Sequence, residues 1–114
     1  MTNTYPVGNV VLCRFAFTTR ALTNAELATF LAGGGLPAGI GVTPATVSFD
    51  YAIGQAAKTT LTGSQITTDA TGAYHVNLNV TTAGQWRYRG YGVDGSANPV
   101  ACTPDVSFMA VRTF

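Results

Sequence analysis

The stretch from Thr68 to Gly90 constrains the fold most strongly, because it reads as turn, strand, turn and strand in succession. Apolar and polar residues alternate along its first strand, in the order Tyr74, His75, Val76, Asn77, Leu78, Asn79 and Val80. A period of two residues is typical of a β-strand that is buried on one face only. After Gly84 the alternation resumes, with two aromatic residues on one face and two arginines on the other: Trp86 and Tyr88, then Arg87 and Arg89. The run therefore predicts an antiparallel β architecture, and it contains no catalytic motif.

Similar patterns predict further short strands, at a spacing of about ten residues that is typical of β-sandwiches. They cover residues 7–17, 45–53, 58–61, 100–102 and 106–112, and residues 65–68 lead into the central run. The chain has 114 residues, which is the size of a single domain. We therefore expect an all-β sandwich of about seven strands that spans residues 1–114.

The first predicted strand, residues 7–17, is apolar on both faces. One face carries Val11, Cys13, Phe15 and Phe17, and the other carries Val10, Leu12, Arg14 and Ala16. The second face is unusually apolar for a surface in contact with water. It is covered either by the segment that follows in the chain or by another subunit.

The segment from Leu22 to Pro44 is predicted to be an insertion after the first strand. A helix over residues 22–32 is indicated by Leu27, Phe30 and Leu31 at helical spacing, and Thr23 and Glu26 have the spacing of a capping box. Residues 33–44 hold five glycines and two prolines, which predicts a loop.

Charge is scarce: 10% of the residues are charged, against about 25% in an ordinary soluble domain, and the net charge is +1. Such a surface is either covered by a partner or solvated through uncharged Thr and Asn side chains. Six scattered basic residues argue against nucleic-acid binding, which needs clustered cations. No apolar run is long enough to span a membrane. The first residues lack the pattern of a signal peptide, so we expect the protein to stay in the cytoplasm or to leave it within an assembly.

Few residues could carry chemistry. The single histidine, His75, falls on the polar face of its strand, and two of the five carboxylates, Asp69 and Asp94, have the sequence context of turns. We therefore expect no enzyme activity, no cofactor and no metal, although a calcium site built from loop aspartates stays open. Cys13 and Cys102 are expected to be buried thiols, and a disulfide between them is the alternative.

The aromatic residues of the second strand in the central run allow two interpretations. Trp86, Tyr88 and Tyr91 either pack in the core, which is the commoner role in sandwiches, or form a platform that stacks on carbohydrate. Arg87 and Arg89 are either partner contacts or simply solvated.

Three motifs of the chain resemble a known family. Tyr5, Gly8 and Val11 match an opening Y-x-x-G-x-x-V, residues 69–74 match a hairpin D-x-x-G-x-Y, and residues 84–88 match a strand G-x-W-x-Y. In these motifs, and over most of its length, the chain resembles the small immunoglobulin-like domain proteins of tailed bacteriophages. It departs from them at residues 22–44, where the family has a short link.

The resemblance implies an immunoglobulin-like antiparallel sandwich and a structural role in the virion, without catalytic residues. We expect a capsid decoration or cement protein that binds the major capsid protein, or another virion protein, in many symmetric copies. A neck or tail component and a carbohydrate-binding module are the alternatives. The expected partner contacts lie in an N-terminal arm (residues 2–6), on the outer face of the first strand, in the glycine-rich loop and at the two arginines: Tyr5, Pro6, Val10, Leu12, Arg14, Gly34, Leu36, Ile40, Arg87 and Arg89.

Overall fold

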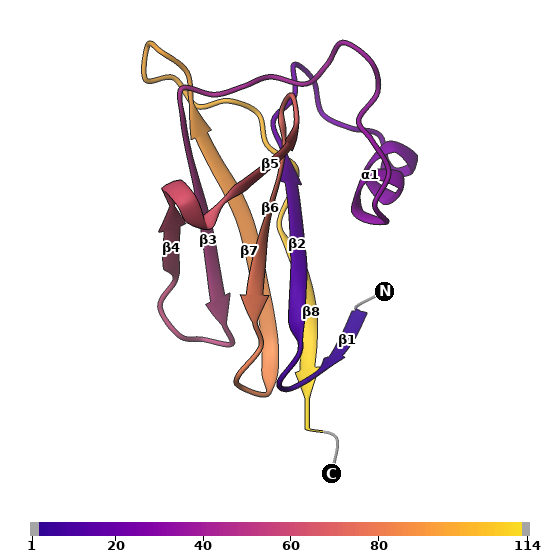
Figure 1. Ribbon diagram of the computed structural model, residues 1–114, viewed down its shortest axis with the longest axis vertical. Helices are drawn as coiled ribbons and strands as arrows, with labels where there is room; N and C mark the ends of the chain where they lie inside the picture. Colours follow the sequence, from indigo (N-terminus) through magenta and orange to yellow (C-terminus); the bar gives the residue numbers. More distant parts are fainter. Residues whose placement is uncertain (1–2, 113–114) are drawn as a thin grey trace.

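The chain folds into two β-sheets that pack face to face, seen in a computed structural model that describes residues 3–112 (Figure 1). The described elements are β1 (Asn3–Pro6), β2 (Val10–Ala16), α1 (Asn24–Leu31), β3 (Thr46–Ile53), β4 (Thr59–Thr62), the 3-10 turn η1 (Gly63–Gln65), β5 (Thr67–Ala70), β6 (Ala73–Asn79), β7 (Gly84–Val93) and β8 (Val106–Val111). One sheet has the strand order β1-β8-β7-β3-β4, and the other has the order β2-β6-β5. The expected all-β sandwich is thus confirmed.

The alternating sequence patterns correspond to the two faces of the strands. β2 and β6 pair antiparallel, with Cys13 opposite Val76 and Phe15 opposite Tyr74. All four of these side chains are buried, because they face the second sheet. The period-two pattern thus fixes which residues enter the core.

Aromatic rings fill the space between the sheets. Phe15 stacks on Tyr74 with ring centroids 5.7 Å apart, and Trp86 is sandwiched between Tyr51 (5.7 Å) and Phe108 (5.9 Å). Aromatic pairs at such distances add to the stabilisation that comes from burial alone.

Two glycines on the inward face of β7 make room for rings from β2. A Cβ atom at Gly90 would lie 2.1 Å from the Phe15 ring, and one at Gly92 would lie 2.7 Å from the Phe17 ring. The absence of side chains at these positions lets the two sheets approach closely.

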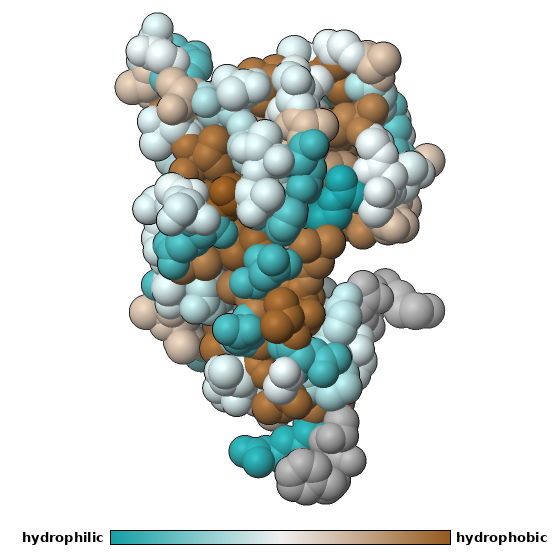
Figure 2. Space-filling view, viewed as in Figure 1, coloured by the Kyte–Doolittle hydropathy of each residue, from teal (hydrophilic) through white to brown (hydrophobic). Residues whose placement is uncertain are grey.

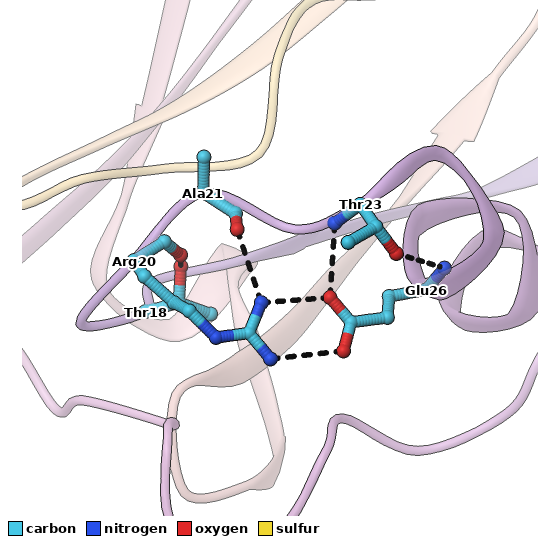
Figure 3. A network of polar contacts seen from close by, with 5 residues as sticks. All are labelled: Thr18, Arg20, Ala21, Thr23 and Glu26. Carbon is cyan, nitrogen blue, oxygen red and sulfur yellow. Dashed lines mark hydrogen bonds and ion pairs between the residues drawn. The ribbon is translucent and has the colours of Figure 1, made fainter.

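The start of α1 is fixed by the capping box expected from the sequence. The Thr23 hydroxyl accepts a hydrogen bond from the Glu26 amide, and the Glu26 carboxylate accepts one from the Thr23 amide. The Arg20 guanidinium donates two hydrogen bonds, of 2.8 and 2.9 Å, to the same carboxylate (Figure 3). Arg20 also donates to the carbonyl of Ala21, so the short link between β2 and α1 is tied to the helix start.

The glycine-rich loop after α1 is attached to the sandwich by backbone hydrogen bonds. Val42 donates to the carbonyl of Phe17 at 2.9 Å, and Thr19 donates to the carbonyl of Ile40 at 3.0 Å. Gly41 lies so close to the carbonyl oxygen of Thr71 that a Cβ atom would approach it to 2.2 Å. The loop therefore follows a fixed path beside the β5–β6 turn.

Three details differ from the sequence prediction. Residues 3–6 form a separate strand, β1, which pairs parallel with β8, so the helix follows the second strand rather than the first. Residues 67–70 form β5, an edge strand paired only with β6. Residues 100–102 form no strand, because the chain between Pro99 and Pro104 makes only an isolated bridge from Cys102 to Phe17. The described residues thus form eight strands, against about seven expected.

Candidate functional site

The outer face of the three-stranded sheet carries the most exposed large apolar side chains of the described residues. Val10 is 60% exposed and Leu12 is 54% exposed. Their cross-strand neighbours on the same face are Asn79 and Asn77, which are uncharged and exposed. Figure 2 shows apolar surface (brown) between hydrophilic patches (teal) on this side of the molecule, where the three-stranded sheet lies in front. We call these four residues the neutral face.

The insertion covers the upper end of this sheet surface, around Arg14 and Ala16. Ala16 is fully buried, in a small second core with Phe30 and Ala73. Arg14 donates hydrogen bonds to the carbonyls of Phe30 and Gly34, and its guanidinium carbon lies 4.2 Å from the centroid of the Phe30 ring. The insertion is one of the two alternatives expected to cover the apolar outer face of β2. It covers the upper end of this face and leaves the neutral face open.

A hollow of about 640 Å³ lies between parts of the glycine-rich loop and the β5–β6 turn and is lined by both. Arg14 and Asp69 line it together with small and apolar residues of the loop, Leu36 and Pro37 among them. The Asp69 carboxylate is 2.7 Å from Nδ1 of His75. From the sequence, Asp69 is expected in a turn and His75 on the polar face of a strand. Their pairing was not predicted, because its only signal in the sequence is the predicted hairpin between them.

The opposite side of the molecule, the outer face of the five-stranded sheet, is charged. Asp50 accepts a hydrogen bond from the Thr60 hydroxyl (2.6 Å) and pairs with Lys58 (3.3 Å). Arg89 lies opposite Asp50 on β7 and approaches Asp105 to 3.8 Å. Arg87 and the Asp50, Lys58, Arg89 and Asp105 side chains border a shallow hollow of about 230 Å³. This charged hollow and the neutral face are therefore on opposite sides of the sandwich.

Each carboxylate of the described residues has a local structural partner. Arg20 and the Thr23 amide lower the pKa of Glu26 to about 2. The Asn98 and Ser96 amides lower the pKa of Asp94 in its turn. Such groups stay ionised and bound near neutral pH, which suits structural roles rather than proton transfer. Within residues 3–112, no three His, Cys, Asp or Glu side chains gather closely enough to hold a metal ion.

The two cysteines are free and unbonded. Burial raises the pKa of the Cys13 thiol to about 12, and burial also raises the pKa of Cys102. The thiolate is the reactive form, so both thiols are held in their unreactive state. The interpretation as buried thiols holds for Cys13, and Cys102 is partly exposed.

The aromatic platform does not form. Trp86 is 2% exposed and Tyr88 is 7% exposed, and both belong to the core. Tyr91 alone of the three is exposed, on the charged side of the sandwich. The core interpretation of Trp86 and Tyr88 is confirmed.

The residues expected to contact a partner fall on two sides of the sandwich. Val10, Leu12, Arg14, Gly34, Leu36 and Ile40 lie on or beside the three-stranded sheet, whereas Arg87 and Arg89 point outward from the five-stranded sheet. Tyr5 is partly buried, with its ring perpendicular to that of Phe108 and the two ring centroids 5.4 Å apart, and Pro6 is partly buried next to it. Thr2, the start of the expected arm, lies outside the described residues. One flat contact cannot include all these positions.

Neither helix of residues 3–112 combines the length and apolarity that a bilayer crossing needs. A scan against protein-family models finds no match, and no curated protein sequence matches the chain. A solved structure described as a "putative glycoside hydrolase" from Bacteroides vulgatus ATCC 8482 resembles the fold with a TM-score of 0.49 and 14% identity. The match covers 99% of this chain and 17% of that protein. A likeness at this level identifies neither the family nor the activity of the chain.

Proposed function

We propose that the protein is a non-catalytic docking domain that attaches to the outside of a larger particle through its neutral face. The observation that carries the proposal is the exposure of Val10 and Leu12 near each other on β2, with only uncharged asparagines as their cross-strand neighbours. Exposed apolar surface bordered by polar groups marks interaction sites in soluble proteins. In line with the motifs of the sequence, the particle we propose is a tailed-bacteriophage virion, with capsid decoration as the role and the neck or tail as the alternative position.

The strand arrangement supports an immunoglobulin-like variety of sandwich. In the immunoglobulin fold, strands B, E and D lie side by side in one sheet, and strands G, F and C in the other. The matching orders here would be β2-β6-β5 for the first sheet and β8-β7-β3 for the second. β4 adds a further strand beside β3, and β1 runs parallel to β8 at the other edge. The inter-sheet disulfide of antibody domains has no counterpart, because Cys13 is free on β2. The chain would thus be an immunoglobulin-like domain with α1 inserted between the B and C strands.

The distribution of charge supports one docking side. The ion pairs of Asp50 with Lys58 and of Arg89 with Asp105 lie on or beside the five-stranded sheet, away from the neutral face. Interface centres are depleted of charged residues, since a buried charge costs free energy unless it is paired. The charged side then remains in water and keeps the decorated particle soluble.

The neutral face would form a weak contact by itself. Val10 and Leu12 still expose about half of their surface, and burying it would contribute roughly 2–3 kcal/mol. Association costs at least that much free energy in lost translational and rotational freedom. A single contact of this kind therefore does not bind one copy of the protein stably to the particle. Contacts between neighbouring copies on a symmetric shell, or additional contacts from the adjacent insertion, would make the attachment stable.

The test is co-sedimentation of purified protein with virus heads that lack it, compared with separated tails. We expect stoichiometric binding to heads by the wild type and loss of binding by Leu12→Glu, which places a charge in the centre of the neutral face. Met109→Glu is the matched control, since Met109 is also exposed (36%) but projects from β8 on the opposite side. Equal binding by the two variants, or no binding of the wild type to heads or tails, would refute the proposal.

A further inference from the structure

We propose that the neutral face is engaged by strand addition: an uncharged extended segment of a partner protein pairs with the free edge of β2 at Val10 and Leu12. This inference rests on the proposed docking function and specifies how the partner binds. β2 is an edge strand, since β6 is its sole neighbour in the three-stranded sheet. An unpaired edge presents a row of main-chain donors and acceptors to any chain that can lie beside it.

The hydrogen-bond pattern shows which groups of β2 face outward. In an antiparallel ladder the main-chain groups of alternate residues point to opposite sides of the strand. The odd-numbered residues point to β6 and its turns, because Val80 donates to the carbonyl of Asn9 and Phe17 donates to that of Gly72. The main-chain N–H and C=O of Val10 and Leu12 therefore point to the free edge.

The upper end of β2 supports this assignment, because the outward main-chain groups of its even-numbered residues already form hydrogen bonds. Thr103 donates to the carbonyl of Ala16 (2.9 Å), and the Ala16 amide donates to the Thr103 hydroxyl (3.2 Å). Thr18 donates to the carbonyl of Ala101 in the same way. Residues 101–103 thus occupy the top of this edge through hydrogen bonds, although they form no regular strand, and they leave it free below.

The free stretch is short and has fixed limits. At its upper limit Arg14 and Tyr88 line the same small hollow. At its lower limit the turn between β1 and β2 is held by a hydrogen bond of 2.7 Å from Gly8 to the Val80 carbonyl. Between these limits no hydrogen bond of Val10 or Leu12 to a described residue outside β2 exists along the edge. The site therefore accepts a few residues of extended chain, which suits a peptide segment.

The surroundings of the edge favour a slender partner over a second copy of the domain. α1 lies beside the upper part of β2 and β1 lies beside its lower part, and the outline of the molecule is indented between them (Figures 1 and 2). A hollow of about 70 Å³ opens there between Tyr5, Leu12 and Leu31. Two copies meeting edge to edge would bring their α1 and β1 elements together, whereas an extended segment fits the indentation.

The partner segment should be uncharged. Val10, Leu12, Tyr5 and Leu31 offer apolar contacts. Arg14, the one cation that the described residues place beside this edge, already donates to two carbonyls and lies over the Phe30 ring. A charged side chain placed there would lose water without gaining a free partner. Alternate β-branched residues, such as Val and Thr, fit a pleated strand at this position.

The experiment uses a blocked heptapeptide, Ser-Val-Thr-Val-Thr-Val-Ser, and the same peptide with Glu in place of each Thr. NMR follows the amide exchange of the full chain. We expect the uncharged peptide to slow exchange at Val10 and Leu12, and the Glu peptide to have no effect. Leu12→Pro removes the outward N–H without breaking the β2–β6 ladder, and should weaken binding by about five- to tenfold. Leu12→Val is the matched control, because it keeps the N–H and an apolar side chain.

The outcomes distinguish strand addition from other ways of docking through the neutral face. Slowed exchange at Val10 and Leu12 supports strand addition even if Leu12→Pro does not fold. No binding at millimolar peptide, or equal binding by folded Leu12→Pro and Leu12→Val, overturns it. If the peptide fails while Leu12→Glu still abolishes co-sedimentation with heads, strand addition is wrong and the docking function stands. If the wild type also fails to bind particles, both proposals fall.

Discussion

The guanidinium of Arg14 lies over the ring of Phe30, 4.2 Å from its centroid, and donates to the Phe30 carbonyl as well. One cation on β2 thus contacts both the side chain and the backbone at the end of α1. A second hydrogen bond, of 3.0 Å, reaches the Gly34 carbonyl in the loop that follows. Arg14 is therefore a side-chain link from β2 to both parts of the insertion, α1 and the loop.

Replacing Arg14 should loosen the insertion without unfolding the sandwich. Arg14→Met keeps the length of the side chain but removes the charge and the donors. We expect a loss of about 1–3 kcal/mol in the local stability of α1, from the cation–π contact and the hydrogen bonds to a charged group. Amide exchange in α1 should become faster while that of β6 stays slow. Arg87→Met, on the exposed face of β7, serves as the control, and equal effects of both changes would contradict this role.

The close approach of the two sheets depends on Gly90. Gly90→Ala would place a methyl group 2.1 Å from the Phe15 ring, which is fixed among other rings of the core. We expect overpacking to lower the free energy of unfolding by about 1–3 kcal/mol, measured by urea denaturation. Gly95→Ala is the control, because nothing lies within 4 Å of its Cβ position. Unchanged stability of Gly90→Ala would show that the sheets can separate at no cost.

Local sequence patterns predicted the parts of the fold that depend on neighbours in the chain. The alternation in β6 identified Tyr74, Val76 and Leu78 as core residues, and all three are buried. The spacing of Thr23 and Glu26 predicted the start of α1, because both residues of a capping box lie within one helical turn.

The parts that could not be predicted depend on long-range pairing. The sequence of β2 does not indicate whether Val10 and Leu12 are covered, because their exposure depends on how far the insertion extends over the strand. The free edge of β2 depends on where residues 101–103, about ninety positions away, leave it. The parallel pairing of β1 with β8 joins the two ends of the described chain, which leaves no local signal.

Trp86 and Tyr91 should respond oppositely to truncation. Trp86 is buried, stacks between Tyr51 and Phe108, and donates from Nε1 to the Thr82 carbonyl at 3.0 Å. We expect Trp86→Ala to cost about 3–5 kcal/mol of stability in thermal or urea unfolding. Tyr91→Ala, on the exposed face of the same strand, should change it by less than about 0.5 kcal/mol. A folded Trp86→Ala variant of near-normal stability would contradict the core assignment.

Acid should loosen the start of α1 before it unfolds the sandwich. The pKa of Glu26 is lowered from 4.5 to about 2, first by the Arg20 hydrogen bonds and then by the Thr23 amide. A lowered pKa in the folded state means that the ionised carboxylate stabilises the fold, fully above pH 4.5 and progressively less as the pH falls towards 2. The helical 13Cα shifts of residues 24–27 should therefore decline across this window, while those of β6 stay constant. Glu26→Gln removes the titrating group, so its shifts there should not change with pH. A decline of equal size in that variant would assign the effect to another group.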